Sequence, residues 1–311
     1  MTGKILGTGA YVPETIWKNS KLEELVETND EWIRERTGIC ERHIAEEIEP
    51  SAMAIEAAKR AMKDWKAHYA SMAPADIDAI FVCTTTSDRV APTISCMVQK
   101  EIGAVNAFCY DMNAACAGFV FAYNMAVSYM NSGLIRTALI VGSEKLSKIV
   151  NWEDRGSCIL FGDGAGAMVV TATEGPGEMV MHSEGAKGEA LECETGAKLS
   201  MDGQKVFKFA VKSVPMAITE LLGKLRMSKN DIDWYILHQA NMRIIESVSK
   251  RLDISMDKIP CNIAKMGNTS SASVGILLDE ARKNGKIKNG DKIIISGFGA
   301  GLTWGAGYII G

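Results

Sequence analysis

A repeat within the chain constrains its fold more strongly than any other feature of the sequence. The matching stretches lie 155 residues apart and, in chain order, are 76–82 with 231–237, Asn113 with Asn268, and Gly142 with Gly297. The first pair reads DIDAIFV and DIDWYIL, and each of the two glycines ends a short apolar run. Because three matches occur in the same order at one interval, the sequence predicts two structurally similar halves.

The apolar runs of both halves are short and rich in β-branched residues. Strands are predicted at 79–83, 137–141, 234–238 and 291–296, and a helix is predicted at 117–131. Runs that are apolar on both faces are typical of strands covered by helices on each side. The predicted architecture is an α/β fold, a five-layered αβαβα sandwich made of two pseudo-symmetric halves, residues 1–172 and 173–311.

The charge and the cysteine pattern narrow the function classes. A formal net charge of −4 gives no general attraction to nucleic acid or to an anionic membrane. The N-terminal segment is too glycine-rich for a signal peptide, and no apolar run approaches the ~20 residues of a membrane span, so we expect a cytoplasmic protein. Eight cysteines without a C-x-x-C pair argue against both a metal site and a disulfide framework. Most of them are expected to be small buried hydrophobic residues.

Cys116 is the one cysteine whose position suggests chemistry. It follows the strand-like run 107–110 and precedes the helical pattern 119–130, so it lies at a strand-to-helix turn. A thiol at a helix N-terminus has a free backbone N–H beside it, and the helix dipole lowers its pKa. The flanking alanines and Gly118 leave room for a substrate. The position alone is equally compatible with a nucleophile and with a core cysteine in a patch of small residues.

Two further polar residues lie where apolar runs end or begin. His238 ends the strand predicted at 234–238, where an imidazole can donate an N–H hydrogen bond to a substrate carbonyl. A single histidine is also commonly structural. Asn268 lies in a turn of small polar residues, 265–273, where asparagine commonly caps a helix or forms a local turn. Each residue on its own leaves the structural alternative open.

Taken together, these motifs resemble the β-ketoacyl-acyl carrier protein synthase III family of the thiolase superfamily. The resemblance extends over nearly the whole chain and includes GTGAYVP at 7–13, WIRERTGI at 32–39, DMNAACAGF at 111–119, FGDGAG at 161–166, HQAN at 238–241, GNTS at 267–270 and GFGAGLTWG at 297–305. It implies a thiolase-like fold with no cofactor and no metal, since acyl-CoA is a substrate and CoA a product. The implied activity is that of an acyltransferase, a decarboxylative Claisen condensation of a short-chain acyl-CoA with malonyl-acyl carrier protein that starts fatty acid biosynthesis.

The same resemblance implies catalytic roles for Cys116, His238 and Asn268. Cys116 would take the acyl group as a thioester, which divides one condensation into two easier reactions. His238 and Asn268 would donate hydrogen bonds to the malonyl thioester oxygen while carbon dioxide leaves. The backbone N–H groups of Cys116 and Ala300 would form a second oxyanion hole around the tetrahedral intermediate.

Substrate contacts are also implied by the resemblance. Coenzyme A would contact Trp32, Arg36, Thr37, Arg155, Ala240 and Asn241. An acyl carrier protein, which is typically acidic, would dock on Lys208, Gln239, Asn241 and Arg243. The acyl pocket would be lined by Ala91, Leu146, Phe161, Gly203, Phe207 and Phe298. We expect a homodimer with twofold symmetry that completes the acyl pocket near Ala91.

Ala91 departs from the family, where this position is often aromatic. Its small side chain predicts a deeper pocket and tolerance of primers longer or more branched than acetyl. A ketosynthase of specialised metabolism with another acceptor would keep the same catalytic residues and stays open as an alternative. A degradative thiolase needs a second cysteine near the C-terminal glycine loop, and 296–305 contains none. The glycine-rich runs do not open a dinucleotide-binding unit, and an inactive scaffold would tend to lose the reactive residues.

Overall fold

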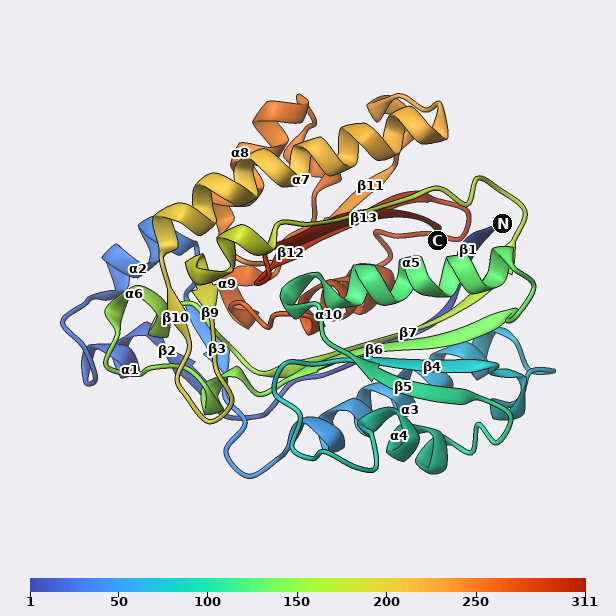
Figure 1. Ribbon diagram of the computed structural model, residues 1–311, viewed down its shortest axis with the longest axis horizontal. Coiled ribbons are helices and arrows are strands. Elements are labelled where there is room, and N and C mark those ends of the chain that lie inside the picture. Colours follow the sequence, from blue (N-terminus) through green and yellow to red (C-terminus); the bar gives the residue numbers. More distant parts are fainter.

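The computed structural model describes residues 1–311, in which strands and helices alternate along much of the chain (Figure 1). The strands are β1 (Thr2–Tyr11), β2 (Ile16–Lys18), β3 (Glu41–His43), β4 (Ala79–Cys83), β5 (Phe108–Met112), β6 (Thr137–Glu144), β7 (Gly164–Thr173), β8 (Met179–Ser183), β9 (Leu191–Glu192), β10 (Ser200–Met201), β11 (Trp234–Leu237), β12 (Lys292–Gly299) and β13 (Thr303–Ile310). The α-helices are α1 (Asn19–Glu23), α2 (Asp30–Thr37), α3 (Pro50–His68), α4 (Ile94–Ile102), α5 (Gly118–Asn131), α6 (Arg155–Cys158), α7 (Gly203–Leu225), α8 (Met242–Leu252), α9 (Ile263–Met266) and α10 (Ala272–Lys283).

Apart from β5, which has no counterpart in the second half, the strands follow the same order in both halves of the chain. The first part of the sheet has the order β1-β7-β6-β4-β5, and the second has the order β8-β13-β12-β11. In each part a parallel pair, β4 with β6 and β11 with β12, is followed by an antiparallel neighbour, β7 and β13 respectively. The predicted α/β fold with two similar halves is confirmed, and the stretches matched at the 155-residue interval overlap the equivalent strands β4 and β11.

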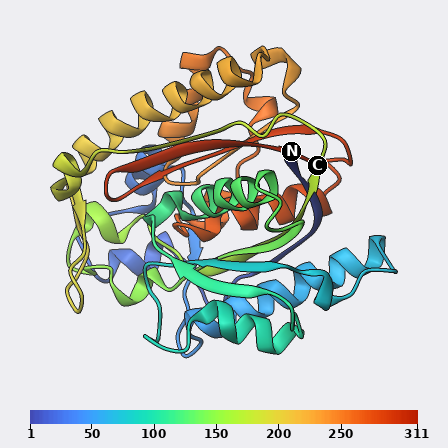
Figure 2. The same ribbon diagram turned by 45° about the vertical axis from the view of Figure 1, so that its right-hand side comes forward.

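Helices separate and cover the two parts of the sheet, which gives five layers (Figures 1 and 2). α5 and α10 lie between the two parts, α3 and α4 cover the outer face of the first, and α7 and α8 cover the outer face of the second. The central apolar cluster joins Phe119 of α5, Leu277 of α10 and Ile295 of β12. One feature was not predicted: β1 and β13 pair in parallel at their ends, so the two parts form one continuous nine-stranded sheet.

A glycine allows α10 to approach the sheet closely. A Cβ at Gly142 of β6 would lie 2.6 Å from the carbonyl oxygen of Ser271, just before α10, so only glycine permits this approach. The same packing brings the N-termini of α5 and α10 together. A Cβ at Gly118, the first residue of α5, would lie 3.0 Å from the Cβ of Cys83 and 3.5 Å from that of Ser271. The ends of β4, α5 and α10 therefore converge on one region.

The predicted elements agree with the structure to within a few residues. β4 occupies the predicted strand 79–83, and β11 ends one residue before the predicted 238. α5 begins at Gly118 because residues 115–117 form a separate 3₁₀ turn. None of the helices combines the length and the apolar content that a membrane crossing requires.

Candidate active site

A strained turn presents Cys116 at the start of α5. The residue lies in the 3₁₀ turn Ala115–Ala117, between β5 and α5. Ala115 has a φ of 46°, in the left-handed region that residues other than glycine rarely adopt. Its backbone N–H donates a hydrogen bond to Asn113 Oδ1 at 3.0 Å, which holds the turn. The strained residue and this hydrogen bond fix the backbone directly before the nucleophile.

Burial controls the ionisation of Cys116. The residue keeps some exposed surface, but protein encloses its sulfur, and desolvation raises the pKa of the thiol to about 12. Hydrogen bonding from Ser270 and from the backbone N–H of Cys116 opposes the rise, whereas the Glu144 carboxylate adds to it. The lowered pKa predicted from the helix N-terminus is wrong, because desolvation by the surrounding protein raises the pKa of this thiol. Cys116 is a neutral thiol that has to lose its proton during any reaction.

His238 follows β11 directly and is a buried, neutral imidazole. Desolvation lowers its pKa to about 3, so the ring is uncharged at neutral pH. Its Nδ1 lies 2.7 Å from Ser273 Oγ, and the backbone N–H of Gln239 donates to the same oxygen at 3.3 Å. Nδ1 is the only acceptor within hydrogen-bonding distance of the Ser273 hydroxyl, so we assign the hydroxyl proton to Nδ1 and the ring proton to Nε2. His238 can therefore donate a hydrogen bond from Nε2.

Asn268 is held by hydrogen bonds that leave one end of its amide available. Its backbone N–H donates to the Leu160 carbonyl at 2.8 Å, and its carbonyl accepts from the Gly162 N–H at 3.0 Å. Its side-chain Oδ1 accepts from the Ser270 N–H at 2.9 Å, which is the local turn that asparagine commonly forms. The Nδ2 end of Asn268 is thus the part of the side chain that can donate to a ligand.

The loop after β12 packs directly against the nucleophile. A Cβ at Gly299 would lie 2.6 Å from the backbone nitrogen of Cys116, so glycine is required there. Thr303 Oγ1 lies 3.0 Å from the Ala300 carbonyl and 3.2 Å from the Ala114 carbonyl, which ties this loop to the nucleophile turn. Cys116 and Ala300 both line the central cavity, as they must if their N–H groups act on one oxygen.

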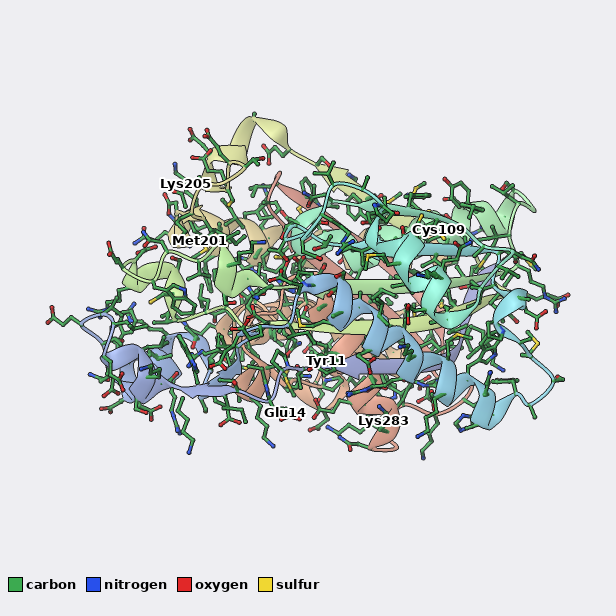
Figure 3. The ribbon with its side chains drawn as sticks, turned by 90° about the horizontal axis from the view of Figure 1, so that it is seen from below. Tyr11, Glu14, Cys109, Met201, Lys205 and Lys283 are labelled. Carbon is green, nitrogen blue, oxygen red and sulfur yellow. The ribbon has the colours of Figure 1, made fainter.

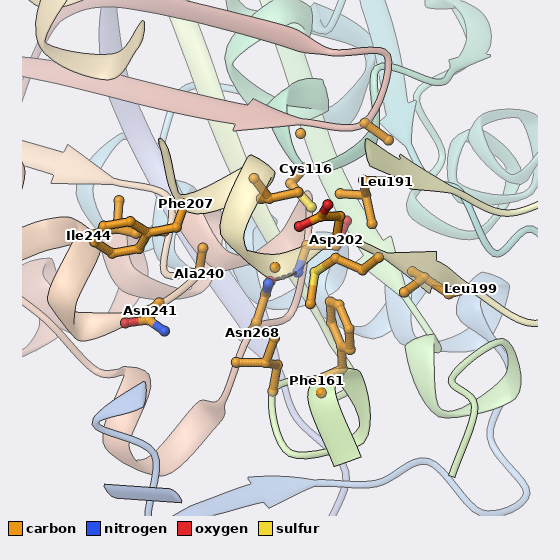
Figure 4. Close-up of a pocket in the computed structure, with 18 of the residues that line it drawn as sticks. Cys116, Phe161, Leu191, Leu199, Asp202, Phe207, Ala240, Asn241, Ile244 and Asn268 are labelled. Atoms are coloured by element: carbon orange, nitrogen blue, oxygen red, sulfur yellow. Dashed lines mark hydrogen bonds between the residues drawn. The ribbon is translucent and has the colours of Figure 1, made fainter. Parts of the chain in front are cut away.

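A cavity of about 910 Å³ joins these groups. Figure 4 shows Cys116 and Asn268 near its middle, Asn241 and Ile244 toward one side, and Leu191 toward the other. Of its 33 lining residues 18 are hydrophobic, so much of the space suits an apolar group. A cavity of this size accommodates an extended ligand rather than a short acyl group alone.

An indole at the cavity is flanked by two guanidinium groups. Arg155 Cζ lies 3.8 Å from the centroid of the Trp32 ring, and Arg36 Cζ lies 4.6 Å from it. Trp32 and Arg36 line the cavity, together with Thr37, whose hydroxyl donates to the Ile33 carbonyl and so stabilises the end of α2. Indole and guanidinium planes both stack on a purine, and arginine binds phosphate. Arg155 lies against the Trp32 indole, the side chain predicted to contact coenzyme A.

Comparison with known proteins places this site in a family. Two family models match, one described as 3-oxoacyl-[acyl-carrier-protein] synthase III over residues 110–188 and one as the C-terminal part of the same enzyme over 222–310. The β-ketoacyl-[acyl-carrier-protein] synthase III of Clostridium acetobutylicum is 44% identical over 97% of both chains. The chain belongs to the synthase III family.

Solved structures agree with this membership in the synthase III family. The crystal structure of 3-oxoacyl-[acyl-carrier-protein] synthase III from Aquifex aeolicus is 42% identical, has a TM-score of 0.93, and is matched over 98% of this chain and 99% of that one. The priming β-ketosynthase from the R1128 polyketide biosynthetic pathway is 33% identical with a TM-score of 0.92, over 99% of this chain and 96% of that one. The matched residues 110–188 contain Cys116, and 222–310 contain His238 and Asn268. A synthase III is an acyltransferase, as the resemblance predicted.

Most of the substrate contacts predicted from the synthase III resemblance line the cavity. They are Trp32, Arg36, Thr37, Leu146, Phe161, Gly203, Phe207, Lys208, Ala240, Asn241, Arg243 and Phe298. Arg155 reaches the site through its contact with Trp32. Asn241 also has a structural role. Its Oδ1 accepts from the Arg243 N–H at the start of α8, and its Nδ2 donates to the Arg36 carbonyl at 3.0 Å. This hydrogen bond joins α2 to α8 at the cavity.

Two predicted contacts do not reach the cavity. Gln239 is fully buried, its amide donates to the Leu237 carbonyl at 2.8 Å, and its Oε1 accepts from the Asn262 N–H at 3.2 Å. Its prediction as a carrier protein contact is wrong, because the turn after β11 directs this side chain into the core. Ala91 is exposed on the loop between β4 and α4, and within one chain it does not line the cavity.

Two parts of the site were missed in the sequence. The hairpin of β9 and β10 contributes Leu191, Leu199 and Met201 to the cavity lining. Its strands have two residues each, too few for a periodic pattern to reveal them. The second part is Glu144, which is buried and accepts a hydrogen bond from Ser270. Here a signal existed, because a carboxylate ends the otherwise uncharged run of β6.

Proposed function

We propose that the protein is a β-ketoacyl-acyl carrier protein synthase III that starts fatty acid biosynthesis. It would move a short-chain acyl group from acyl-CoA to Cys116 and then join it to malonyl-acyl carrier protein with loss of carbon dioxide. The observation that carries the proposal is the convergence of Cys116, His238 and Asn268 on one cavity that Trp32 also lines. A nucleophile, two neutral N–H donors and a stacking platform are the parts that a CoA-dependent condensation requires.

In the first half of the proposed reaction, the Cys116 sulfur attacks the thioester carbonyl of acyl-CoA. The carbonyl oxygen becomes negative, and the N–H groups of Cys116 and Ala300 are the donors proposed to stabilise it. The bond to the CoA sulfur then breaks, the thiol proton is transferred to CoA, and the acyl group stays on Cys116. Acyl-CoA is thus a substrate and CoA a product, and the proposal includes no resident cofactor or metal.

In the second half, the malonyl thioester loses carbon dioxide and becomes an enolate. Its oxygen would accept hydrogen bonds from Nε2 of His238 and Nδ2 of Asn268. Both side chains are buried and neutral, so these hydrogen bonds act at low local polarity, where they stabilise a developing charge more than they do in water. The enolate carbon then attacks the acyl carbonyl, the bond to Cys116 breaks, and the sulfur takes up a proton from water.

Exposed cations at the cavity are the proposed contacts of the acyl carrier protein. Lys208 on α7 and Arg243 on α8 are exposed and line the cavity. Positive charge at this place would attract an acidic carrier protein and orient it toward the cavity. Lys205, which Figure 3 shows near Met201, contributes less because it lies 3.7 Å from Asp202.

The proposal includes a homodimer that completes the acyl pocket. β5 is an edge strand, and its Phe108 is 38% exposed, while Val90 on the loop before α4 is 100% exposed. An edge strand with exposed apolar side chains is suited to pair with a second copy of the chain. Ala91, beside Val90, would then reach the partner's acyl pocket. Its small side chain predicts acceptance of primers longer or more branched than acetyl.

A ketosynthase of specialised metabolism is the second candidate. It is favoured by the likeness to the R1128 priming β-ketosynthase, which the same catalytic residues would also serve. The higher identity to the Clostridium acetobutylicum enzyme favours the fatty acid assignment.

The proposal also includes two structural and cellular expectations. The halves 1–172 and 173–311 are proposed as domains, which their repeated strand order supports. A cytoplasmic location is in keeping with eight free cysteines.

A product assay with a panel of primers tests the proposal. The protein is incubated with malonyl-acyl carrier protein and either acetyl-, butyryl-, isobutyryl- or hexanoyl-CoA, and β-ketoacyl-carrier product and carbon dioxide are measured. Equal amounts of both are expected, with at least one primer other than acetyl accepted. Use of acetyl-CoA alone would contradict the deeper pocket predicted from Ala91. Product formed only with an acceptor other than malonyl-acyl carrier protein would replace the first candidate by the second.

A further inference from the structure

A buried carboxylate lies behind the nucleophile and has no cation beside it. Glu144, the last residue of β6, is fully buried, and no lysine, arginine or histidine forms an ion pair with it. Its Oε2 accepts from the Thr85 N–H at 3.0 Å, from Thr85 Oγ1 at 3.0 Å and from Thr86 Oγ1 at 2.8 Å. Its Oε1 lies 3.1 Å from Ser270 Oγ and 2.8 Å from Ser271 Oγ. Burying such a group is costly, so its place in the site requires an explanation.

Ser270 connects this carboxylate to the nucleophile. Its hydroxyl donates to Glu144 Oε1 at 3.1 Å, and its side chain is the hydrogen-bonding group that opposes the rise in the pKa of the Cys116 thiol. Both Ser270 and Cys116 line the cavity, whereas Glu144 lies behind them. The three groups therefore form a chain from the reacting sulfur to a buried carboxylate: thiol, hydroxyl, carboxylate.

The histidine of the site is poorly suited to accept the thiol proton. The network through Ser273 places the ring proton of His238 on Nε2, which suits donation to a thioester oxygen and leaves no lone pair there for a proton. Burial also lowers the pKa of His238 to about 3, so its basicity is weak. Glu144 differs, because burial raises the pKa of its carboxyl group above the usual value and so increases its affinity for a proton.

We propose that Ser270 passes the Cys116 proton to Glu144 while the sulfur attacks acyl-CoA, which frees His238 and Asn268 to act as donors only. The thiol proton moves to Ser270 Oγ, the original Ser270 proton moves to Glu144 Oε1, and the sulfur–carbon bond forms. When the bond to CoA breaks, the same path returns one proton to the CoA sulfur. One sulfur–carbon bond forms and one breaks, and the proton lost by Cys116 is gained by CoA, so no further reactant is needed. In this path Ser270 lies between the reacting sulfur and Glu144, and Glu144 acts through it as a positioning and proton-holding residue.

A purely structural role for Glu144 predicts something different. Ser270 has a φ of 50°, in the left-handed region, and its N–H holds Asn268 Oδ1. If Glu144 only fixed this loop, its loss would displace Asn268 and slow malonyl decarboxylation. Proton transfer predicts the opposite pattern, because decarboxylation removes no proton from a thiol. The inference rests on the proposed function, and acylation and decarboxylation can be measured separately.

The test compares Glu144→Gln and Ser270→Ala with the control Ser271→Ala in the full-length protein. Ser271 Oγ lies within donating distance of Glu144 Oε1 at 2.8 Å and of the Cys83 carbonyl at 3.0 Å, but it has no hydrogen bond with the thiol. Acylation of Cys116 by acetyl- and butyryl-CoA is followed by intact mass over a range of pH. Decarboxylation of malonyl-acyl carrier protein is measured in the Cys116→Ala background, with and without Glu144→Gln. Alkylation of Cys116 by iodoacetamide, located by peptide mass, reports thiol ionisation without any substrate.

Glu144→Gln and Ser270→Ala are expected to slow acylation by roughly 100-fold at neutral pH, the usual contribution of a positioned proton acceptor. The deficit should shrink as pH rises, because hydroxide replaces the missing acceptor, while Ser271→Ala changes acylation by a few-fold at most and decarboxylation is unchanged. Equal losses in all three variants, or a loss of decarboxylation, would overturn the inference in favour of a structural role. Wild-type rates in both relay variants would also overturn it. Failure of the wild-type protein to acylate would instead refute the proposed function.

Discussion

Gly299→Ala is the substitution whose effect follows most directly from the geometry of the site. The added Cβ would lie 2.6 Å from the Cys116 backbone nitrogen and 3.1 Å from its Cβ, whereas ordinary contacts begin near 3.4 Å, so the loop or the nucleophile has to move by about 0.8 Å. Misplacement of about 1 Å in a catalytic group costs on the order of 100-fold in rate, and loss of one oxyanion donor costs roughly 100- to 1000-fold. We therefore expect acylation of Cys116, followed by intact mass after rapid quenching, to slow by about 100-fold.

A glycine elsewhere in the chain provides a matched control. Gly223 lies in α7, and a Cβ there would meet no atom within 4 Å. Gly223→Ala is expected to acylate at the wild-type rate and to gain roughly 0.5–1 kcal/mol of stability, because alanine loses less backbone entropy in a helix. A folded Gly299→Ala protein with the wild-type acylation rate would refute the placement of the Gly299–Ala300 loop at the reacting carbonyl.

Three further predictions concern the donors and the coenzyme. Asn268→Ala should leave acylation of Cys116 nearly unchanged and slow decarboxylation of malonyl-acyl carrier protein by roughly 100- to 1000-fold. The substitution removes a donor that is used only in the second half-reaction. Equal losses in both half-reactions would contradict this separation. Trp32→Ala should raise the KM for acyl-CoA by about 10-fold with little change in kcat. The reason is that stacking and cation–π contacts contribute on the order of 1–2 kcal/mol to binding. A fall in kcat alone would contradict the coenzyme role. Burial lowers the pKa of His238 from 6.5 to about 3, so the neutral ring stabilises the folded state above pH 6.5 and this stability is lost as pH falls toward 3. Urea unfolding should show the wild type losing about 2 kcal/mol more than His238→Gln between pH 6.5 and about 5, and parallel pH profiles would contradict the assigned burial.

The fold was predictable because its strands are locally distinctive. The apolar runs at 79–83 and 234–238 are short, β-branched and bounded by polar residues, so each could be assigned without knowledge of its neighbours. The internal repeat then fixed the equivalence of β4 with β11. The pairing of β1 with β13 was not predictable, because it joins residues about 300 positions apart through two backbone contacts that leave no side-chain pattern.

The catalytic residues were predictable by motif, whereas their environment was not. The sequence places His238 at the end of a strand, Cys116 at a strand-to-helix turn and Asn268 in a turn of small polar residues. The pKa of Cys116 depends on how completely the folded chain surrounds it, and the neighbours responsible, Glu144 and Ser270, come from strands and loops distant in sequence. Gln239 was misassigned for a related reason, since its neighbours in the HQAN motif line the cavity while its own side chain points inward.

The central claim is that Cys116 carries the acyl group between two half-reactions. Intact mass after incubation with butyryl-CoA tests it directly, with Cys116→Ser and wild type measured side by side before and after addition of malonyl-acyl carrier protein. The account predicts one added butyryl group on the wild-type chain and none on the Cys116→Ser chain. Once malonyl-acyl carrier protein is present, the butyryl group on the wild-type chain should disappear as carbon dioxide is released. An acyl group that forms equally on Cys116→Ser, or on another of the eight cysteines, would contradict the account.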